Sequence, residues 1–469
     1  MDEGQPPRRG GNDEPPVPGN GAPHGDDEDP LAALFRRLGL SGPDGTVDLP
    51  SMMAQVQRMM AQMGPAATDP NSGVDWAQTR SLARQYVASL GSDPSQNQND
   101  QRRVADALRL AQNWLDPATS LPATTLEPHA WSRAEWVEHS MDNWRAIAEP
   151  IVTRIANAMS DLLSQGGPAA DAEASPLDSL QNLFTPMAKQ AAGAMYSQHL
   201  AQAIGALATQ VLSGNDSGLP LVDPPVLAML PVNVDAFQAG LGQTTDDVLL
   251  YLTLRETARQ RLFAAAPWLE TQMLALIEHY AREITIDAAA LHDAVDLGDL
   301  EGLTPQRLAQ ASQALQGRLF SPARTPEQTE ILARLETLTA LTEGWVETVV
   351  AAAAAPWMPG ADALAESIRR RRAAGGPAER LLSAMVGLEL RPRRLRDAVN
   401  LWSALGSQCG IVTRDALWRH PDILPTAADL DDIIGFVQRQ SAPDAESDAM
   451  DAELQRLLDQ WQDGNGDTH

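Results

Sequence analysis

Apolar residues recur every three or four positions along most of the chain, whereas the strict alternation of a half-buried strand is almost absent. Leu332, Leu335, Val346 and Val350 illustrate one such helical stripe. The pattern predicts a mainly α fold made of many packed helices. The expected helical segments are residues 31–40, 49–63, 76–90, 102–115, 131–164, 180–212, 245–265 and 331–354.

The two ends of the chain differ in composition from the rest. Residues 1–29 are rich in Pro, Gly, Asp and Glu, and residues 441–469 are similarly polar, so neither end can bury enough apolar surface to order itself. We expect disordered acidic N- and C-terminal tails, the second with one short amphipathic helix around Leu458. Between them we expect an N-terminal helical region at residues 30–165 and a helical core at residues 176–440.

Charge and composition exclude several classes of function. The chain has 469 residues and a net charge of −27, which argues against binding nucleic acid or an anionic membrane. Its longest apolar run, residues 349–358, is too short to span a bilayer, and no secretory signal is visible, so we expect a cytoplasmic protein without membrane insertion. The single cysteine, Cys409, excludes an intramolecular disulfide and a cysteine-based zinc site, and its apolar context favours a core residue over a nucleophile.

Two further segments allow a functional and a structural interpretation. Residues 49–63 form a methionine-rich face, which suits varied partners but is more often an adaptable packing surface. The run of four arginines at residues 369–372 could contact an anionic partner, but we expect a solvated loop edge.

A charged motif lies inside the expected helix at residues 245–265. Arg255-Glu256-Thr257-Ala258-Arg259 has the frame of a zinc-protease helix, in which two histidines one turn apart bind the metal and the intervening glutamate is the general base. Arginine stands at both histidine positions. A guanidinium has five donors and no acceptor lone pair, so neither arginine can bind zinc.

Around this motif the chain resembles an actinobacterial zincin-like family assigned as hydrolases or zinc-dependent metalloproteases. The resemblance covers roughly residues 31–438 and implies a zincin-like helical core. It also implies that catalytic relatives have histidines at positions 255 and 259, the general base at position 256 and a third metal ligand at position 343. The blocks that carry it are Val74-Asp75-Trp76, Leu219-Pro220-Leu221 through Leu230-Pro231-Val232-Asn233-Val234, the motif with Pro267-Trp268-Leu269, Leu341-Thr342-Glu343-Gly344, Arg393-Arg394-Leu395-Arg396-Asp397-Ala398, and Asp415-Ala416-Leu417-Trp418-Arg419-His420-Pro421-Asp422.

Both arginines share a helical stripe with apolar residues, and Glu343 and Glu347 lie on the apolar face of the helix at residues 331–354. We therefore predict that Arg255 and Arg259 pair with Glu343, and with Glu347 or Glu256, in the space that a metal would occupy in a catalytic relative. We therefore expect no metal or cofactor. Zinc would be expected only if this chain kept the activity that the family resemblance implies.

Two other interpretations of the motif stay open. The motif could be a solvated helix face, since Arg and Glu at helical spacing are common on surfaces. Alternatively, other ligands could build a metal site, with His279 and His292 joining Glu343. The chain has eight histidines, none of them paired at i and i+4: His24, His129, His139, His199, His279, His292, His420 and His469.

Three functions compete on this sequence. The favoured one is a catalytically inactive zincin-like protein that binds a protein or peptide of unknown identity in the former substrate cleft, with Glu256 idle at the general-base position. The second is an active zinc-dependent hydrolase with unconventional ligands, and the third is a structural or assembly protein that uses its N-terminal helices and acidic tails.

Overall fold

The computed structural model describes residues 74–165, 193–194, 196–216, 218–219, 221–222, 225–283, 325–373, 376 and 393–441. All of them belong to the second of two compact units, residues 67–469. The expected tails, the helices at residues 31–40 and 49–63, and His24, His292 and His469 lie outside the described residues. The domain boundaries expected near residues 29, 165–176 and 440 fall at or beyond the ends of described segments and stay predictions.

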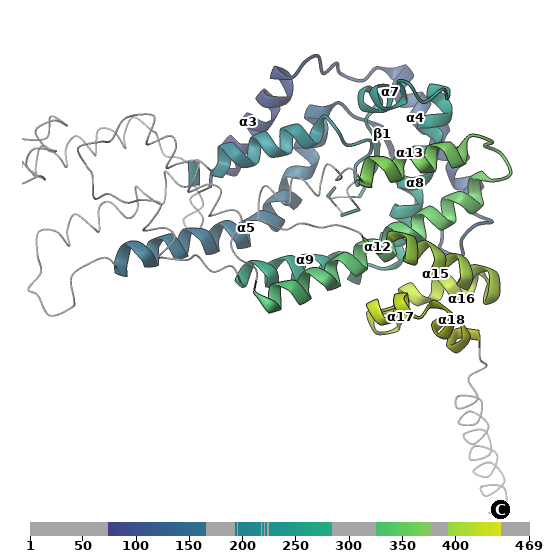
Figure 1. The fold of residues 1–469 in the computed structure, drawn as a ribbon. Helices are drawn as coiled ribbons and strands as arrows, with labels where there is room; N and C mark the ends of the chain where they lie inside the picture. Colours follow the sequence, from purple (N-terminus) through teal and green to yellow (C-terminus); the bar gives the residue numbers. More distant parts are fainter. Residues whose placement is uncertain are drawn as a thin grey trace, which may run out of the picture. The chain divides into compact units, whose positions relative to one another are not determined.

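The described residues are mainly helical, which confirms the mainly α prediction (Figure 1). Observed helices lie within a few residues of the expected ones, as at residues 76–90 and 102–115, where the helices run from 76 to 89 and from 98 to 115. The helices are α3 (Trp76–Ser89), α4 (Gln98–Leu115), α5 (Arg133–Gln165), α7 (Pro231–Gln238), α8 (Thr245–Ala265), α9 (Trp268–Arg282), α12 (Pro326–Ala354), α13 (Ala361–Ala373), α15 (Leu395–Gln408), α16 (Gly410–Ala416), α17 (Ala427–Asp431) and α18 (Ile433–Ser441), with residues 196–208 also helical and short 3₁₀ turns η2 (Leu417–Arg419) and η3 (Pro421–Ile423).

Side-chain caps fix where the two central helices begin. The Thr244 hydroxyl accepts a hydrogen bond from the backbone N–H of Asp247 at 3.1 Å and starts α8. Thr325 and Gln328 form a reciprocal capping box at the start of α12. Both caps are local, since each joins residues only three positions apart in the sequence.

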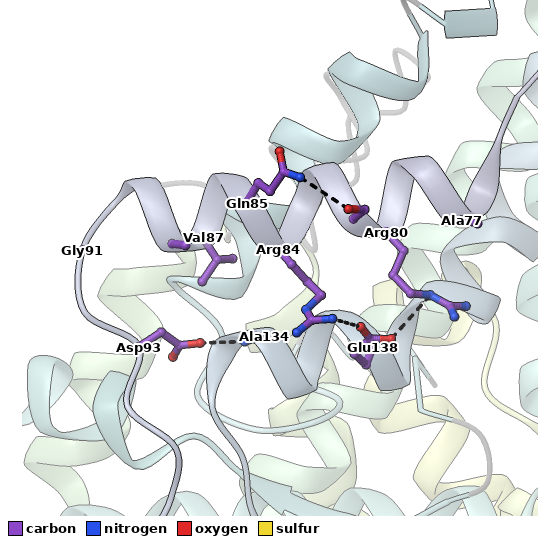
Figure 2. A pocket seen from close by; sticks show the side chains of 11 residues that line it. Ala77, Arg80, Arg84, Gln85, Val87, Gly91, Asp93, Ala134 and Glu138 are labelled. Carbon is purple, nitrogen blue, oxygen red and sulfur yellow. Dashed lines mark hydrogen bonds and ion pairs between the residues drawn. The ribbon is translucent and has the colours of Figure 1, made fainter. Parts of the chain in front are cut away.

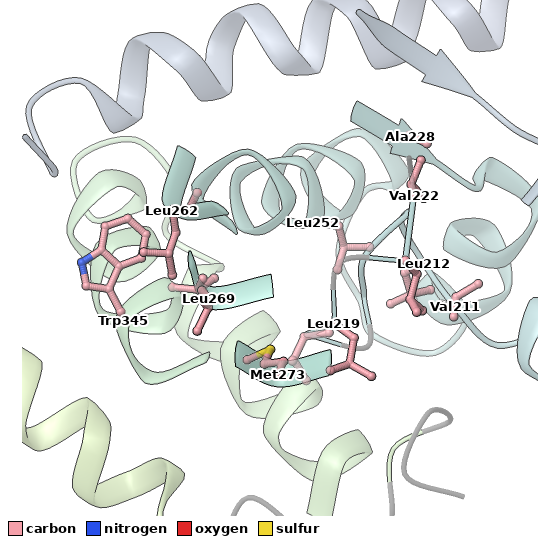
Figure 3. Close-up of a cluster of buried hydrophobic side chains, with 14 of the residues drawn as sticks. Val211, Leu212, Leu219, Val222, Ala228, Leu252, Leu262, Leu269, Met273 and Trp345 are labelled. Carbon is pink, nitrogen blue, oxygen red and sulfur yellow. The ribbon is translucent and has the colours of Figure 1, made fainter. Parts of the chain in front are cut away.

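Helix α8 lies at the centre of the described fold. It packs against α4 on one side and α12 on another, and α12 also contacts α9 and α15. Every residue from Val248 to Leu262 except Leu250 is buried, so each polar side chain in this stretch must find its partner inside the protein. Figure 3 shows apolar neighbours of α8, among them Leu212, Met273 and Trp345, in one buried cluster.

Close packing of α12 on α15 depends on Gly344. A Cβ at this position would lie 2.7 Å from the Cβ of Ala398, too close for any larger residue without a shift of the helices. At the next residue of α12, Trp345 Nε1 donates to the buried carboxylate of Asp415 at 2.8 Å, which also accepts from Thr119 Oγ1 at 2.7 Å and Arg414 Nε at 2.7 Å. Two of the blocks that carried the family resemblance therefore have structural roles in holding α12.

The described residues contain two short strands, β1 (Pro128–Ala130) and β2 (Leu227–Met229). They pair in parallel, with His129 opposite Ala228. The segment before β2 also returns to it, since the backbone N–H of Gly214 donates to the carbonyl of Ala228 at 2.9 Å. This pairing holds the loop that begins at Ser213 against the middle of α8, where Ser213 donates to Glu256 at 2.7 Å.

Several smaller expectations can be compared with the structure. Trp131, Trp136 and Trp144 are buried in the core. Cys409 is only half-buried, at the junction of α15 and α16, because a helix end leaves one side open. None of the described helices is both long and apolar enough to cross a bilayer.

Candidate functional site

Helices α8 and α12 bring the motif and Glu343 together in the interior. Arg255 Nη2 lies 2.9 Å from Glu343 Oε2, while Arg259 donates to Glu343 Oε1 from Nη2 at 2.8 Å and from Nε at 3.1 Å. Arg255 is 5% exposed, and Arg259 and Glu343 are 1% exposed. The motif is therefore not a solvated helix face.

A third arginine reaches the same carboxylate from α13. Arg372 Nη1 lies 2.7 Å from Glu343 Oε2. The expectation that residues 369–372 form a solvated loop edge was wrong, because these arginines are the last turn of a helix whose buried face carries Leu364 and Ile368. The next positions on that face are 371 and 372, whereas Arg369 and Arg370 remain exposed.

Glu256 is fully buried and accepts four hydrogen bonds. Its Oε2 receives Arg259 Nη1 at 2.8 Å and Ser213 Oγ at 2.7 Å. Its Oε1 receives Asn215 Nδ2 and Gln260 Nε2, each at 3.1 Å. An ionised carboxylate has about four lone-pair sites, so these donors satisfy it completely.

The loop after residue 212 packs against both helices of the site, with Ser213 bound to Glu256 of α8 and Gly218 next to Glu343 of α12. Asp216 binds Arg371 Nη1 at 2.9 Å and accepts the backbone N–H of Leu212 at 3.1 Å. Gly218 has φ of +77°, and a Cβ there would lie 3.0 Å from Glu343 Oε1. Glycine is therefore required both by the backbone conformation and by the approach to the carboxylate.

The pKa values of Glu343, Arg259 and Asp216 are all displaced in the direction that favours the charged form. Burial would raise the pKa of Glu343, but the guanidiniums of Arg259, Arg372 and Arg255 outweigh it and hold that pKa far below its usual range. Burial would lower the pKa of Arg259, but Glu343 and Glu256 raise it. Asp216 behaves like Glu343, since Arg371 and Arg372 lower its pKa against the effect of burial.

Glu347 does not join the pair of motif arginines. It binds Arg369 Nε at 2.9 Å instead. Glu347 lies one turn further along α12 than Glu343. At that level of the helix its neighbour is α13, which carries Arg369. The predicted participation of Glu347 with Arg255 and Arg259 was wrong for that reason.

His279 and Glu343 do not form the alternative metal site. His279 Nε2 lies 3.0 Å from Glu327 Oε1 at the start of α12. Sixteen residues of one helix separate Glu327 from Glu343, which at 1.5 Å per residue is about 24 Å. One metal cannot bridge that distance.

The donor set of the arginine–glutamate cluster does not fit zinc. Zinc needs imidazole nitrogen, thiolate or carboxylate ligands at roughly 2.0–2.3 Å, and a guanidinium has no lone pair to give. Arg255 and Arg259 occupy the two positions at which the family resemblance implies histidine. The carboxylate at the third position, Glu343, is already bound by three arginines.

Sequence reasoning missed most of the polar partners of this cluster. Gln260, the residue after the motif, is one such partner and binds Glu256. Arg261 is also buried, but it lies on another side of α8, where it binds Asp116 at 2.7 Å. The helical period through Leu364 and Ile368 would have placed Arg372 inward. The loop contributes Ser213, Asn215, Asp216 and Gly218 to the cluster. No comparable sequence signal marks these residues, because positions in a loop do not follow a helical or strand period.

A separate groove of about 530 Å³ lies between α3 and α5 (Figure 2). Both of its arginines pair with Glu138: Arg84 Nη1 lies 2.8 Å from Oε1, and Arg80 Nε lies 3.7 Å from Oε2. No residue predicted for the site lines this groove.

Comparison with known proteins identifies the family. Among solved structures, one from Chloroflexus aurantiacus, described as "a putative hydrolase with a novel fold", matches with a TM-score of 0.50 and 18% identity over 79% of this chain and 99% of that one. At this identity the likeness concerns the fold alone. No curated protein was similar enough to count as a relative. Residues 74–437 match the model of the zincin-like metallopeptidases, so the chain belongs to that family.

Proposed function

We propose that this chain is a non-catalytic zincin-like protein that acts by binding a protein or peptide. The observation that carries the proposal is the state of Glu343, whose carboxylate is held by Arg255, Arg259 and Arg372 where a catalytic relative would need a metal ligand. The guanidiniums of the two motif residues, Arg255 and Arg259, stand in for the positive charge that a divalent cation would otherwise bring. The cluster is thus stable without any metal.

The state of Glu256 supports the same conclusion. A general base needs a free lone pair and a water molecule within hydrogen-bond distance. All four acceptor positions of Glu256 are engaged by protein donors, and the side chain has no exposed surface. Without a metal to lower the pKa of a bound water, the carboxylate has no nucleophile to activate.

Burial also bears on where a partner would bind. Glu256, Arg259 and Glu343 are all inside the protein, so a peptide does not reach them directly. Large apolar side chains do remain exposed elsewhere, including Trp357 at 65% and Ile434 at 73%. Exposed aromatic and apolar groups are the kind of anchor that protein partners use, which favours binding at the surface over binding at the former catalytic carboxylates.

The test combines binding and cleavage in one experiment. The immobilised full chain and its Glu256→Gln variant are incubated with a random peptide library, and retained and released peptides are identified by mass spectrometry. We expect retained peptides to be intact and both proteins to behave alike. Fragments produced by the wild type and not by the variant would overturn the proposal, and the absence of any retained peptide would overturn its binding half.

A substitution in the opposite direction tests the role of the arginines. Arg255→His with Arg259→His recreates the donor set that zinc requires on α8, with Glu343 as the third ligand. We expect the double variant to retain one more zinc ion per chain after dialysis than the wild type. Equal zinc content in the two proteins would show that the arginines are not what keeps metal from this position.

A further inference from the structure

The far ends of α9 and α12 bring together a second set of metal-ligating side chains. His279 and Glu283 are four residues apart at the C-terminal end of α9, so they share a face. Glu327 comes from the first turn of α12. Gln328 Nε2 donates to the carbonyl of Tyr280 at 3.3 Å and holds the two helix ends in register.

We propose that His279, Glu283 and Glu327 bind a divalent transition-metal ion of the zinc class, about 24 Å along α12 from the arginine–glutamate cluster. His279 Nε2 lies 3.0 Å from Glu327 Oε1, and the ligand atoms of all three residues lie within 4.8 Å of one another. Among the residues that the structure describes, this is the one group of three with such geometry.

The distances suit a single small cation. Zinc binds imidazole nitrogen and carboxylate oxygen at about 2.0–2.2 Å, which places tetrahedral ligands about 3.3 Å apart. His279 Nε2 and Glu327 Oε1, 3.0 Å apart, are close to that separation. All three side chains are at least partly exposed, so small rotations bring Glu283 in as the third ligand. Three protein ligands leave a fourth position for water.

The donor types and charges select the ion. Two carboxylates with one neutral imidazole give the set a charge that a divalent cation neutralises. An imidazole ligand suits zinc, cobalt or nickel, whereas magnesium and calcium prefer oxygen alone. Arg282, beside Glu283 in the sequence, pairs with Glu278 and not with this set.

An ordinary surface ion pair is the competing interpretation, and the chain contains a matched example. His420 Nδ1 lies 3.4 Å from Asp422 Oδ2, and both side chains are exposed. This pair belongs to no group of three potential metal ligands among the described residues. It therefore serves as a control for binding by a histidine and one carboxylate.

The test is a zinc titration of the full chain by calorimetry, compared with His279→Ala, Glu327→Gln and the control His420→Ala. We expect saturable binding of one zinc ion per chain, weakened about tenfold or more by each of the first two substitutions and unchanged in the control, with no competition from excess magnesium. Absence of saturable binding, or equal binding by the wild type and His279→Ala, would overturn the proposal.

Because the three side chains lie at the surface, the variants are expected to keep the wild-type melting temperature, which a thermal melt verifies. The outcome is independent of the proposed non-catalytic function. Zinc that is lost in His279→Ala belongs to this peripheral set, whereas zinc that persists in this variant and is lost in Glu343→Gln would place a metal in the arginine–glutamate cluster and contradict the function proposed above.

Discussion

Replacing Glu343 by alanine tests whether the buried arginines depend on its charge. The substitution removes the carboxylate that Arg255, Arg259 and Arg372 share, and it leaves a cluster with an excess of positive charge in the interior. Arg259 keeps Glu256 as a partner, and Arg372 is partly exposed, so both retain some compensation. Arg255 has no other ion-pair partner among the described residues, so its charge bears most of the loss.

Removing one partner from a buried ion pair typically lowers the free energy of unfolding by about 3–5 kcal/mol. For a cooperative unit of roughly 300 residues, with an unfolding entropy of about 2.1 cal/mol/K per residue, this corresponds to a fall in melting temperature of about 5–8 °C. Thermal unfolding followed by circular dichroism, with urea titration at 25 °C, measures both quantities.

A matched control separates burial from charge. Glu366 also binds two arginines, Arg369 and Arg370, each at 2.7 Å, but it lies on the exposed face of α13. Water solvates these arginines when the carboxylate is removed, so Glu366→Ala is expected to unfold within experimental error of the wild type. If Glu343→Ala shifted the melting temperature no more than Glu366→Ala does, the buried-pair reasoning would be refuted.

Three further predictions concern the same region. Because the pKa of Glu343 in the folded protein is held below its ordinary value, the stability that this carboxylate contributes is complete above the unfolded-state pKa of about 4.3 and declines below it. The difference in free energy of unfolding between the wild type and Glu343→Gln, measured by urea titration, should therefore narrow from about pH 4 downward. A difference that stays constant to about pH 3 would contradict this. Gly218→Ala should destabilise the protein more than Gly240→Ala, since both glycines have positive φ but only the first would place a Cβ against Glu343; equal melting temperatures would show that the loop moves aside. Asp415→Ala leaves buried Arg414 without its carboxylate and should lower the free energy of unfolding by about 3–5 kcal/mol in urea titration, whereas a loss within error would mean that Arg414 is solvated in the variant.

Much of the fold was predictable because it depends on local rules. The period of apolar residues predicted the helices, and the expected bounds of residues 245–265 agree with those of α8. The change from histidine to arginine was also visible in the sequence, since no arrangement of neighbours gives a guanidinium a lone pair for zinc. The absence of metal ligands at positions 255 and 259 therefore follows from the identity of these two residues alone.

Only the tertiary structure decided which charges meet. Glu343 and Glu347 lie on the same face of α12, yet the first binds the motif and the second binds Arg369, because neighbouring helices approach that face at different heights. The run at residues 369–372 has the composition of a solvated surface, but packing of Leu364 and Ile368 turns Arg372 inward. A local pattern determines which face of a helix is buried, whereas the partner on that face depends on how distant segments pack, and no local rule specifies that packing.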